Sequence, residues 1–380
     1  MPLRLHVRDG LAGVDPAAWD ALVGDGSPFL EWGWLASLEA SGCVAPNSGW
    51  LPQHLTLWDG DLLIGACPLY VKGHSDGEFV FDHGWAQAAA RAGIRYYPKL
   101  LTAVPFTPAT GCRFLTRPGV DRAAVIRVLG SALKDICTGN GLSSAHVNFC
   151  LADEAAVLAD LGFVRRTGYQ FQWRNPGGWR TFDDYLAAFR SKRRVQIRRE
   201  RRELEAQGIT ITAVAGEAID DGLFEPMFAL YTSTIDKYYW GRQYLNRELF
   251  ELLRRRWKRR LCFIVARRGA DVVAATFNVR KGGTMYGRYW GTAEELRYLH
   301  FNVCYYAAID YCLRERITRF EPGAGGEFKY LRGFDAQLTE SMHFIADRRL
   351  AAAVARHLEG EREAVASEVT WLGERSPLKG

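Results

Sequence analysis

The polar and apolar positions in the second half of the chain predict a strand, a helix and a second strand in close succession. Residues 284–290 alternate small or polar residues with aromatic ones, which is typical of a strand. Residues 301–313 are apolar on nearly every side and predict a buried helix of about three turns. Residues 319–321 predict a short strand, which Pro322 ends because proline has no N–H to donate to a neighbouring strand.

The loop after this second strand carries the candidate chemistry. Its glycines at positions 323, 325 and 326 allow the backbone to approach a ligand closely. Sites commonly lie on loops that follow a strand end. We therefore expect a substrate pocket here, with charged side chains from Glu321, Glu327, Lys329 and Arg332.

The two halves of the chain repeat one order of predicted elements. The first half predicts strands at 54–58, 62–71 and 78–81, a helix at 123–137 and a strand at 145–150. The second half predicts strands at 262–267, 272–280 and 284–290, the helix at 301–313 and a strand at 318–321. Two copies of one α/β unit are the simplest explanation.

A loop signal at residues 175–178, Asn-Pro-Gly-Gly, separates the halves. We expect a first domain at 1–175, a second at 176–349, and a C-terminal helix and tail at 350–380. After the loop, Thr181 can cap a helix over 182–189, and Ser191 can cap a basic helix within 191–206.

Composition narrows the class of protein. At 380 residues the chain exceeds the size at which single cores usually stop growing, and its 48% hydrophobic and 24% charged residues are ordinary for a globular protein. Its eight cysteines form no C-x-x-C pair and no zinc-type spacing with histidine. The first residues do not resemble a signal peptide, and no apolar run is long enough to span a membrane. We expect a cytoplasmic protein with free thiols, no metal and no redox cofactor.

The basic helix is a candidate nucleic-acid surface. Residues 190–202 contain eight Lys or Arg among thirteen, and Arg194, Arg198 and Arg201 fall on one helical face. A phosphate backbone is a fitting partner, and the net charge of +6 does not oppose it. The alternative is a solvated face paired with neighbouring glutamates at 200, 203 and 205. A second basic run, 254–260 around Trp257, adds positive charge.

Motifs spread along nearly the whole chain resemble the FemAB-like family of peptidoglycan biosynthesis or recognition proteins. They are Asp15-Pro-Ala-Ala-Trp-Asp20, Gly77-Glu-Phe-Val-Phe-Asp82, Tyr96-Tyr-Pro-Lys-Leu100, Pro105-Phe-Thr-Pro108, residues 192–202, Tyr286–Gly291, Leu299-His-Phe301, and Lys329 with Arg332-Gly-Phe334. The resemblance implies an α/β fold of two tandem GNAT-like domains, the acyl-CoA N-acyltransferase fold, with mixed sheets flanked by helices. Related Fem-type aminoacyltransferases move an amino acid from aminoacyl-tRNA to an amine of a cell-wall precursor.

Two segments resemble the Fem-type transferases in particular. Residues 191–199 are similar to their basic helix, and Phe328-Lys329 with Arg332-Gly333-Phe334 is similar to their closing motif. The resemblance implies that tRNA contacts Arg193, Arg194, Arg198 and Arg201.

The chain departs from its own branch of the family at three positions. The family pattern has His where Gln172 stands, Glu where Asn302 stands, and His where Phe328 stands. Each change removes an ionisable group. If these groups transfer protons in relatives, this chain uses another base or another acceptor, as a specialised member, for example in secondary metabolism, would.

Acylation of an amine requires a base for its proton and stabilisation of the carbonyl oxygen as that atom gains charge. Glu321 is the first candidate base, Glu327 the second, and His300 can shuttle protons. Lys329 and Arg332 can bind a phosphate, a carboxylate or the developing oxyanion. Further candidates for substrate binding are Tyr286, Arg288, Trp290, Tyr305, Asn302 and Gln172. The alternatives are solvated carboxylates, structural ion pairs and ordinary aromatic packing.

Aminoacyl-tRNA is the expected co-substrate, with no bound cofactor, and the acceptor is a small-molecule, cell-wall or natural-product amine. Acyl-CoA is the alternative donor. GNAT proteins bind its pyrophosphate on a glycine-rich loop that opens a helix, whereas residues 292–300 contain no glycine. Fem-type proteins lack that loop as well, so aminoacyl-tRNA is favoured. A third possibility is a non-catalytic protein that binds RNA or a cell-wall precursor.

Overall fold

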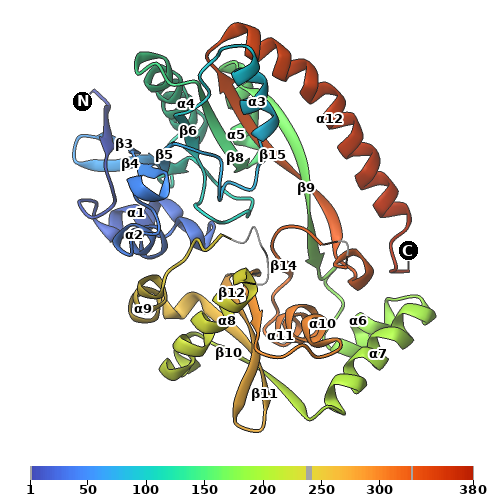
Figure 1. The fold of residues 1–380 in the computed structure, drawn as a ribbon. Coiled ribbons are helices and arrows are strands. Elements are labelled where there is room, and N and C mark those ends of the chain that lie inside the picture. The colour runs from blue at the N-terminus through green and yellow to red at the C-terminus, as the bar shows by residue number, and fades with distance from the viewer. Residues whose placement is uncertain (1, 237–241, 327, 380) are drawn as a thin grey trace. The chain divides into compact units, whose positions relative to one another are not determined.

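The computed structural model describes residues 2–236, 242–326 and 328–379 and divides into two compact units (Figure 1). Unit 1 comprises Met1–Tyr169 and Leu338–Ser367, and unit 2 comprises Gln170–Gln337 and Glu368–Gly380. The domain ranges expected from sequence place residues 338–349 in the second domain, whereas the structure groups them with unit 1. The reason is a long-range strand pairing, because residues 340–345 pair with residues 144–150.

The strands of unit 1 form two sets of hydrogen-bonded neighbours. The first has the order β1-β3-β4-β7, formed by β1 (Arg4–Arg8), β3 (His54–Asp59), β4 (Leu62–Cys67) and β7 (Leu115–Thr116). The second has the order β15-β8-β6-β5-β2, formed by β15 (Asp335–Ile345), β8 (Ser144–Cys150), β6 (Lys99–Thr102), β5 (Leu69–Lys72) and β2 (Trp50–Pro52). Within the second set β6 and β8 are parallel.

The helices of unit 1 are α1 (Pro16–Val23), α2 (Trp32–Ala40), α3 (His83–Arg91), α4 (Arg122–Gly139), α5 (Ala152–Asp160) and the first part of α12 (Arg348–Glu374). Apolar side chains of α4 and α5, such as Leu129 and Leu158, form one core with the strands. A second cluster joins Trp85 of α3 to Leu350 and Leu358 of α12. The C-terminal helix therefore completes the core of unit 1.

Unit 2 is a sheet with the order β10-β11-β12-β13-β14-β9. Its strands are β10 (Ile209–Ala215), β11 (Leu261–Arg268), β12 (Asp271–Lys281), β13 (Thr284–Thr292), β14 (Arg319–Glu321) and the end of β9 (Val164–Arg174). Its helices are α6 (Phe182–Ala187), α7 (Ser191–Glu205), α8 (Phe224–Asp236), α9 (Arg247–Arg256), α10 (Leu299–Phe301) and α11 (Ala307–Arg314). A π-helical turn, Asn302–Tyr306, links α10 to α11.

Most predicted elements are confirmed. The helices predicted at 123–137 and 301–313 correspond to α4 and to the α10–α11 segment, and the basic helix corresponds to α7. The strand predicted at 62–71 is divided into β4 and β5, because Pro68 cannot donate to a strand neighbour. Each unit contains a parallel pair joined through a helix, β6 with β8 and β13 with β14, as a duplication predicts.

The predicted strand at 78–81 is wrong. These residues form bends and coil, and Phe79 has a φ of 59°, because Glu78 and Asp82 both turn inward to Lys99. The Lys99 ammonium donates to Glu78 Oε2 at 2.8 Å, to Asp82 Oδ2 at 2.5 Å and to Ser75 Oγ at 2.9 Å. All of these side chains are buried. The counterpart of β13 in unit 1 is therefore β6, which begins at Lys99.

None of the helices in the described ranges has the length and apolar character needed to cross a lipid bilayer.

We expect Lys99→Met to lower the free energy of unfolding by about 3–5 kcal/mol, because it removes the ammonium group that bridges two buried carboxylates. Urea denaturation followed by tryptophan fluorescence measures the change. The exposed Lys192→Met variant is the matched control and should differ from the unchanged protein by less than about 0.5 kcal/mol. An unaltered urea midpoint for Lys99→Met would show that the cluster contributes nothing to stability.

Candidate active site

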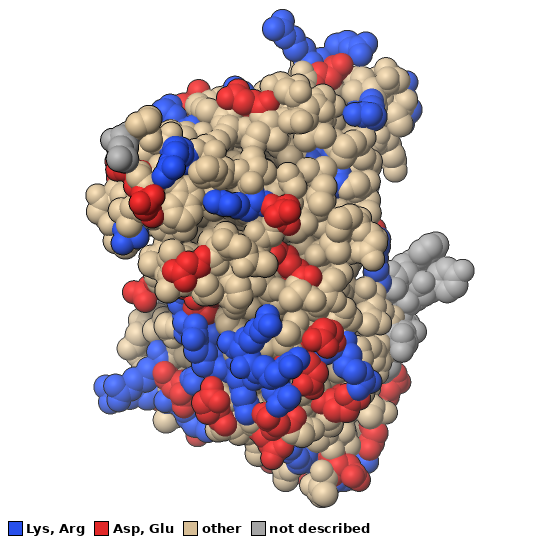
Figure 2. Space-filling model, turned by 90° about the vertical axis from the view of Figure 1, so that its left-hand side faces the viewer, with Lys and Arg blue, Asp and Glu red and all other residues tan. Residues whose placement is uncertain are grey.

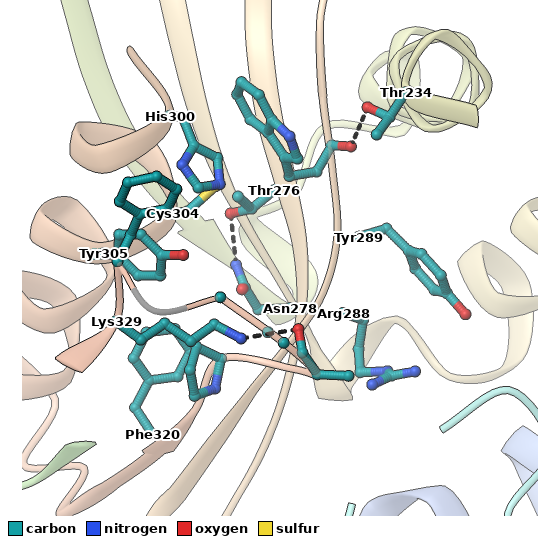
Figure 3. Close-up of a pocket in the computed structure, with 17 residues that line it drawn as sticks. Thr234, Thr276, Asn278, Arg288, Tyr289, His300, Cys304, Tyr305, Phe320 and Lys329 are labelled. Carbon is teal, nitrogen blue, oxygen red and sulfur yellow. Dashed lines mark hydrogen bonds between the residues drawn. The ribbon is translucent and has the colours of Figure 1, made fainter. Parts of the chain in front are cut away.

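The candidate site lies where β13 and β14 separate. The two parallel strands pair over three positions, the last of which joins Tyr286 to Glu321. Pro322 then ends β14, while β13 continues to Thr292. A Cβ at Gly287 would lie 3.2 Å from Phe320 and from Pro322, closer than most such contacts, so glycine favours this close approach. The divergence of the strands opens a cavity of about 420 Å³ in unit 2 (Figure 3).

Aromatic rings form much of the cavity wall. They belong to Tyr289, Trp290, His300, Tyr305, Phe320 and Phe328. The His300 ring lies 4.9 Å from the Trp290 ring and 5.3 Å from the Tyr305 ring, both in edge-on geometry. Figure 3 shows His300, Cys304 and Tyr305 together on one side, with Tyr289 and Arg288 on the other. The wall therefore suits a flat or apolar group.

His300 is held as a neutral imidazole. Burial, together with the positive charges of Arg332 and Lys329, lowers the pKa of His300 to about 4. The neutral imidazole has one ring nitrogen free to accept a proton, and its low pKa makes it a weak base in the unliganded protein. Cys304, whose pKa is raised by burial, is a neutral thiol in the same wall.

Lys329 holds the glycine-rich loop. Its ammonium donates to the carbonyl oxygens of Gly323 at 2.6 Å and Ala324 at 3.0 Å, and its side chain lines the cavity. Burial lowers the pKa of Lys329 to about 8. At neutral pH the group is therefore still mostly an ammonium, and it sits in a poorly solvated position where charge acts strongly.

Glu321 is buried beside the cavity and is not part of its lining. Gln172 Nε2 donates to Glu321 Oε1 at 3.4 Å, and the Arg319 guanidinium lies 3.5 Å from the same oxygen. Gln172 Oε1 in turn accepts from Arg174. The amide at position 172 therefore orients the carboxylate. Glu327, the second candidate base, lies outside the described residues.

The structure brings five of the predicted residues into the cavity lining, and these are Arg288, Trp290, His300, Tyr305 and Lys329. Tyr286 is buried one position before the strands separate, with its hydroxyl 3.5 Å from Arg319. Asn302 and Arg332 face α7 instead. Asn302 donates to the backbone oxygen of Glu200, and Arg332 pairs with the Glu200 carboxylate.

Sequence reasoning missed several residues of the cavity lining. Thr276 and Asn278 project from β12 into the lining, and Asn278 Nδ2 donates to Thr276 Oγ1 at 2.8 Å. Two polar residues within an otherwise apolar strand were the available signal. Thr234 of α8 donates to the Trp290 carbonyl oxygen, but nothing in its sequence context pointed to the site.

The arginines of α7 lie on two parts of its surface. Arg198 and Arg201 line a groove of about 420 Å³ together with Asp183, Leu186, Val195, Arg202 and Glu205. Arg198 is half-exposed and lies 3.6 Å from Asp183, and Arg201 stacks on Phe182. Arg193 and Arg194 make local contacts with Gln196 and with the Phe189 carbonyl oxygen. A phosphate would find Arg198 and Arg202 exposed on this side of the helix.

The second basic run is partly paired with carboxylates. Arg254 and Lys258 both pair with Asp221, and Arg255 pairs with Glu248. Trp257 is buried within the run. Figure 2 shows Lys and Arg gathered on the lower part of one face, with Asp and Glu among them. Such a mixed surface is less suited to a phosphate backbone than a purely basic one.

The described residues contain no group of three or more His, Cys, Asp or Glu side chains that is placed to hold a metal ion.

Comparison with solved structures shows which fold this is. The chain is similar to the crystal structure of FemX, with 12% identity, a TM-score of 0.56, and coverage of 93% of this chain and 100% of the other. It is also similar to L-PGS from Bacillus licheniformis, with 9% identity, a TM-score of 0.53, and coverage of 95% and 98%. The expected fold class, α/β with two tandem GNAT-like units, is thereby confirmed.

Comparison of sequences identifies the family. A search of curated proteins finds no match. The model of one protein family, described as FemAB-like, peptidoglycan biosynthesis/recognition, matches residues 10–380. The chain belongs to this FemAB-like family.

Proposed function

We propose that the protein is an N-acyltransferase that forms an amide bond between an acyl or aminoacyl group and an amine, with aminoacyl-tRNA as the donor. One observation carries the proposal, namely that the neutral His300 imidazole and the buried Lys329 ammonium line one aromatic cavity. Membership of the FemAB-like family supports the same class of reaction.

The two groups suit the two demands of acyl transfer. The amine nitrogen attacks the carbonyl carbon, loses a proton, and the donor oxygen leaves with a proton. The His300 imidazole accepts the proton of the amine and returns it to the leaving oxygen. The Lys329 ammonium faces the carbonyl oxygen as that oxygen becomes negative. A donor group that packs against the aromatic wall would shield the reacting carbonyl from water, which would otherwise hydrolyse the donor.

Glu321 has a supporting part in this scheme. Its carboxylate is buried and hydrogen-bonded to Gln172, outside the lining of the cavity. It contributes negative charge close to Tyr286 and Arg319, at the end of the strand that carries the loop. We therefore assign the proton transfer to His300, ahead of Glu321.

The α7 groove supports tRNA as the donor. Arg198, Arg201 and Arg202 line it, and Arg198 and Arg202 are exposed there. The segment that precedes α10 contains no glycine with which to hold the pyrophosphate of an acyl-CoA. Charged tRNA is a cytoplasmic molecule, so we place the reaction in the cytoplasm.

Binding of the donor is tested by filter titration with total charged tRNA at several salt concentrations. We expect micromolar, salt-sensitive binding, and Arg198→Glu should weaken it and reduce the salt slope by about one. Arg127→Glu, a charge reversal on the exposed face of α4 in unit 1, is the matched control. Heat on titration with acetyl-CoA, together with no binding of tRNA, would replace tRNA by acyl-CoA as the donor.

The proton acceptor is tested by single-turnover transfer from charged tRNA to a panel of amines. We expect His300→Gln to lower the rate by about 100-fold or more, because the glutamine amide cannot take up a proton. Glu321→Gln should cost less than about tenfold. The reverse order of effects would make Glu321 the base, and transfer unaffected by either change would favour a binding protein without catalysis.

The charge of Lys329 predicts a pH dependence. Because the pKa of Lys329 is lowered to about 8, its ammonium form is lost as the pH rises through 8, and the transfer rate should fall there. Lys329→Arg stays charged and should retain its rate up to pH 9, whereas Lys281→Arg should keep the profile of the unchanged protein. A rate that increases through pH 8 would show instead that the neutral amine of Lys329 acts as the base.

A further inference from the structure

A buried carboxylate lies on the inner side of the basic helix α7. Glu200 is 1% exposed and lies between Ile197 and Leu204, the other buried residues of the helix. Burying a carboxylate is costly unless it is paired and hydrogen-bonded. Three side chains meet this requirement at Glu200, and two of them come from segments that form the walls of the cavity.

The first connection leads to the loop of Lys329. Arg332 Nη2 donates to Glu200 Oε2 at 3.1 Å, and Arg332 Nη1 donates to the Phe328 carbonyl oxygen at 2.9 Å. The same guanidinium stacks on Phe301, 3.4 Å from the ring centre. Arg332 thus fixes the backbone directly before Lys329, and Phe328 itself lines the cavity.

The second connection leads to the π-helical turn, which forms another part of the cavity wall. The Tyr306 hydroxyl donates a short hydrogen bond to Glu200 Oε2, and Asn302 Nδ2 donates to the Glu200 backbone oxygen at 3.1 Å. Both residues belong to the π-helical turn that presents Cys304 and Tyr305 to the cavity. Such turns depart from regular helix geometry and need fixing by their surroundings.

Glu200 also has a local partner on α7. Gln196 Nε2 donates to Glu200 Oε1 at 2.9 Å, and Gln196 accepts from Arg193. Arg193 is one of the basic residues proposed to face the donor. The outer, basic side of α7 is therefore joined through Gln196 to a carboxylate that contacts both the segment of Arg332 and the π-helical turn.

We propose that Glu200 is the positioning residue of the site, which holds the Phe328–Lys329 loop and the π-helical turn at a fixed spacing and so sets where Lys329 stands in the cavity. This inference rests on the proposed function only where it gives the position of Lys329 a role in catalysis. The positioning itself is a property of the unliganded protein and can be measured without any transfer reaction.

The test is competitive labelling of lysines with a trace of acetic anhydride across pH 6–11, read for each lysine by mass spectrometry. In the unchanged protein Lys329 should titrate near 8. In Glu200→Gln the guanidinium of Arg332 loses the anion that anchors it, and the loop gains access to water. Desolvation is the main cause of the low Lys329 pKa, so its relief should outweigh the opposing charge of the unpaired Arg332 and raise that pKa by about one unit or more toward the ordinary value of about 10.4. Glu203→Gln, on the same helix but outside this network, should leave it unchanged.

A purely structural role for Glu200 would lower thermal stability and leave the Lys329 titration of the folded protein where it was, and that result would overturn the proposal. Tyr306→Phe removes one donor from Glu200 with little change in volume, so it serves if Glu200→Gln does not fold, and it should shift Lys329 in the same direction by less. If the labelling shifts as expected and no transfer from charged tRNA is found, the positioning stands and the proposed reaction fails.

Discussion

The early end of one strand pair is the constraint on which the candidate site depends. β14 is three residues long, and Pro322 removes the next N–H that could have continued the ladder to β13. The adjacent strand runs on, so beyond Tyr286 its backbone edge lies beside space that a longer partner would have filled. The aromatic wall, the glycine-rich loop and Lys329 are all arranged around that gap. The site therefore exists because β14 ends before the strand beside it does.

The sequence predicts the local parts of this arrangement well. The alternation in β13, the apolar helix after it and the strand broken by Pro322 are each determined by neighbouring residues, and each was predicted with nearly correct bounds. His300, Lys329 and Tyr305 could be placed in one pocket for the same reason. The π-helical turn inside the helix was not predictable, because its apolar pattern is that of an ordinary helix.

The errors concern contacts between residues distant in sequence. Residues 78–81 alternate as a strand does, yet the attraction of two carboxylates to Lys99, about twenty positions later, determines their conformation. The alternative interpretation of the basic helix made Glu200 a solvated partner of neighbouring arginines, whereas its spacing from Ile197 and Leu204 places it on the buried stripe of α7. The position of Arg332 has the same cause, because its guanidinium pairs with the buried Glu200 carboxylate and so does not line the pocket.

Unit 1 is built from two segments that lie far apart in the sequence, and this affects how the protein folds while it is being synthesised. Strand β8 ends at Cys150, but the strand that pairs with it, β15, ends at Ile345, nearly two hundred residues later in the sequence. A ribosome delivers most of β15 only after residues Gln170–Gln337 of unit 2, so the nascent first half exposes an open strand edge throughout that interval. Unit 1 cannot finish folding in the order in which it is made. The chain must keep that edge from pairing with other nascent chains until its own last strand arrives.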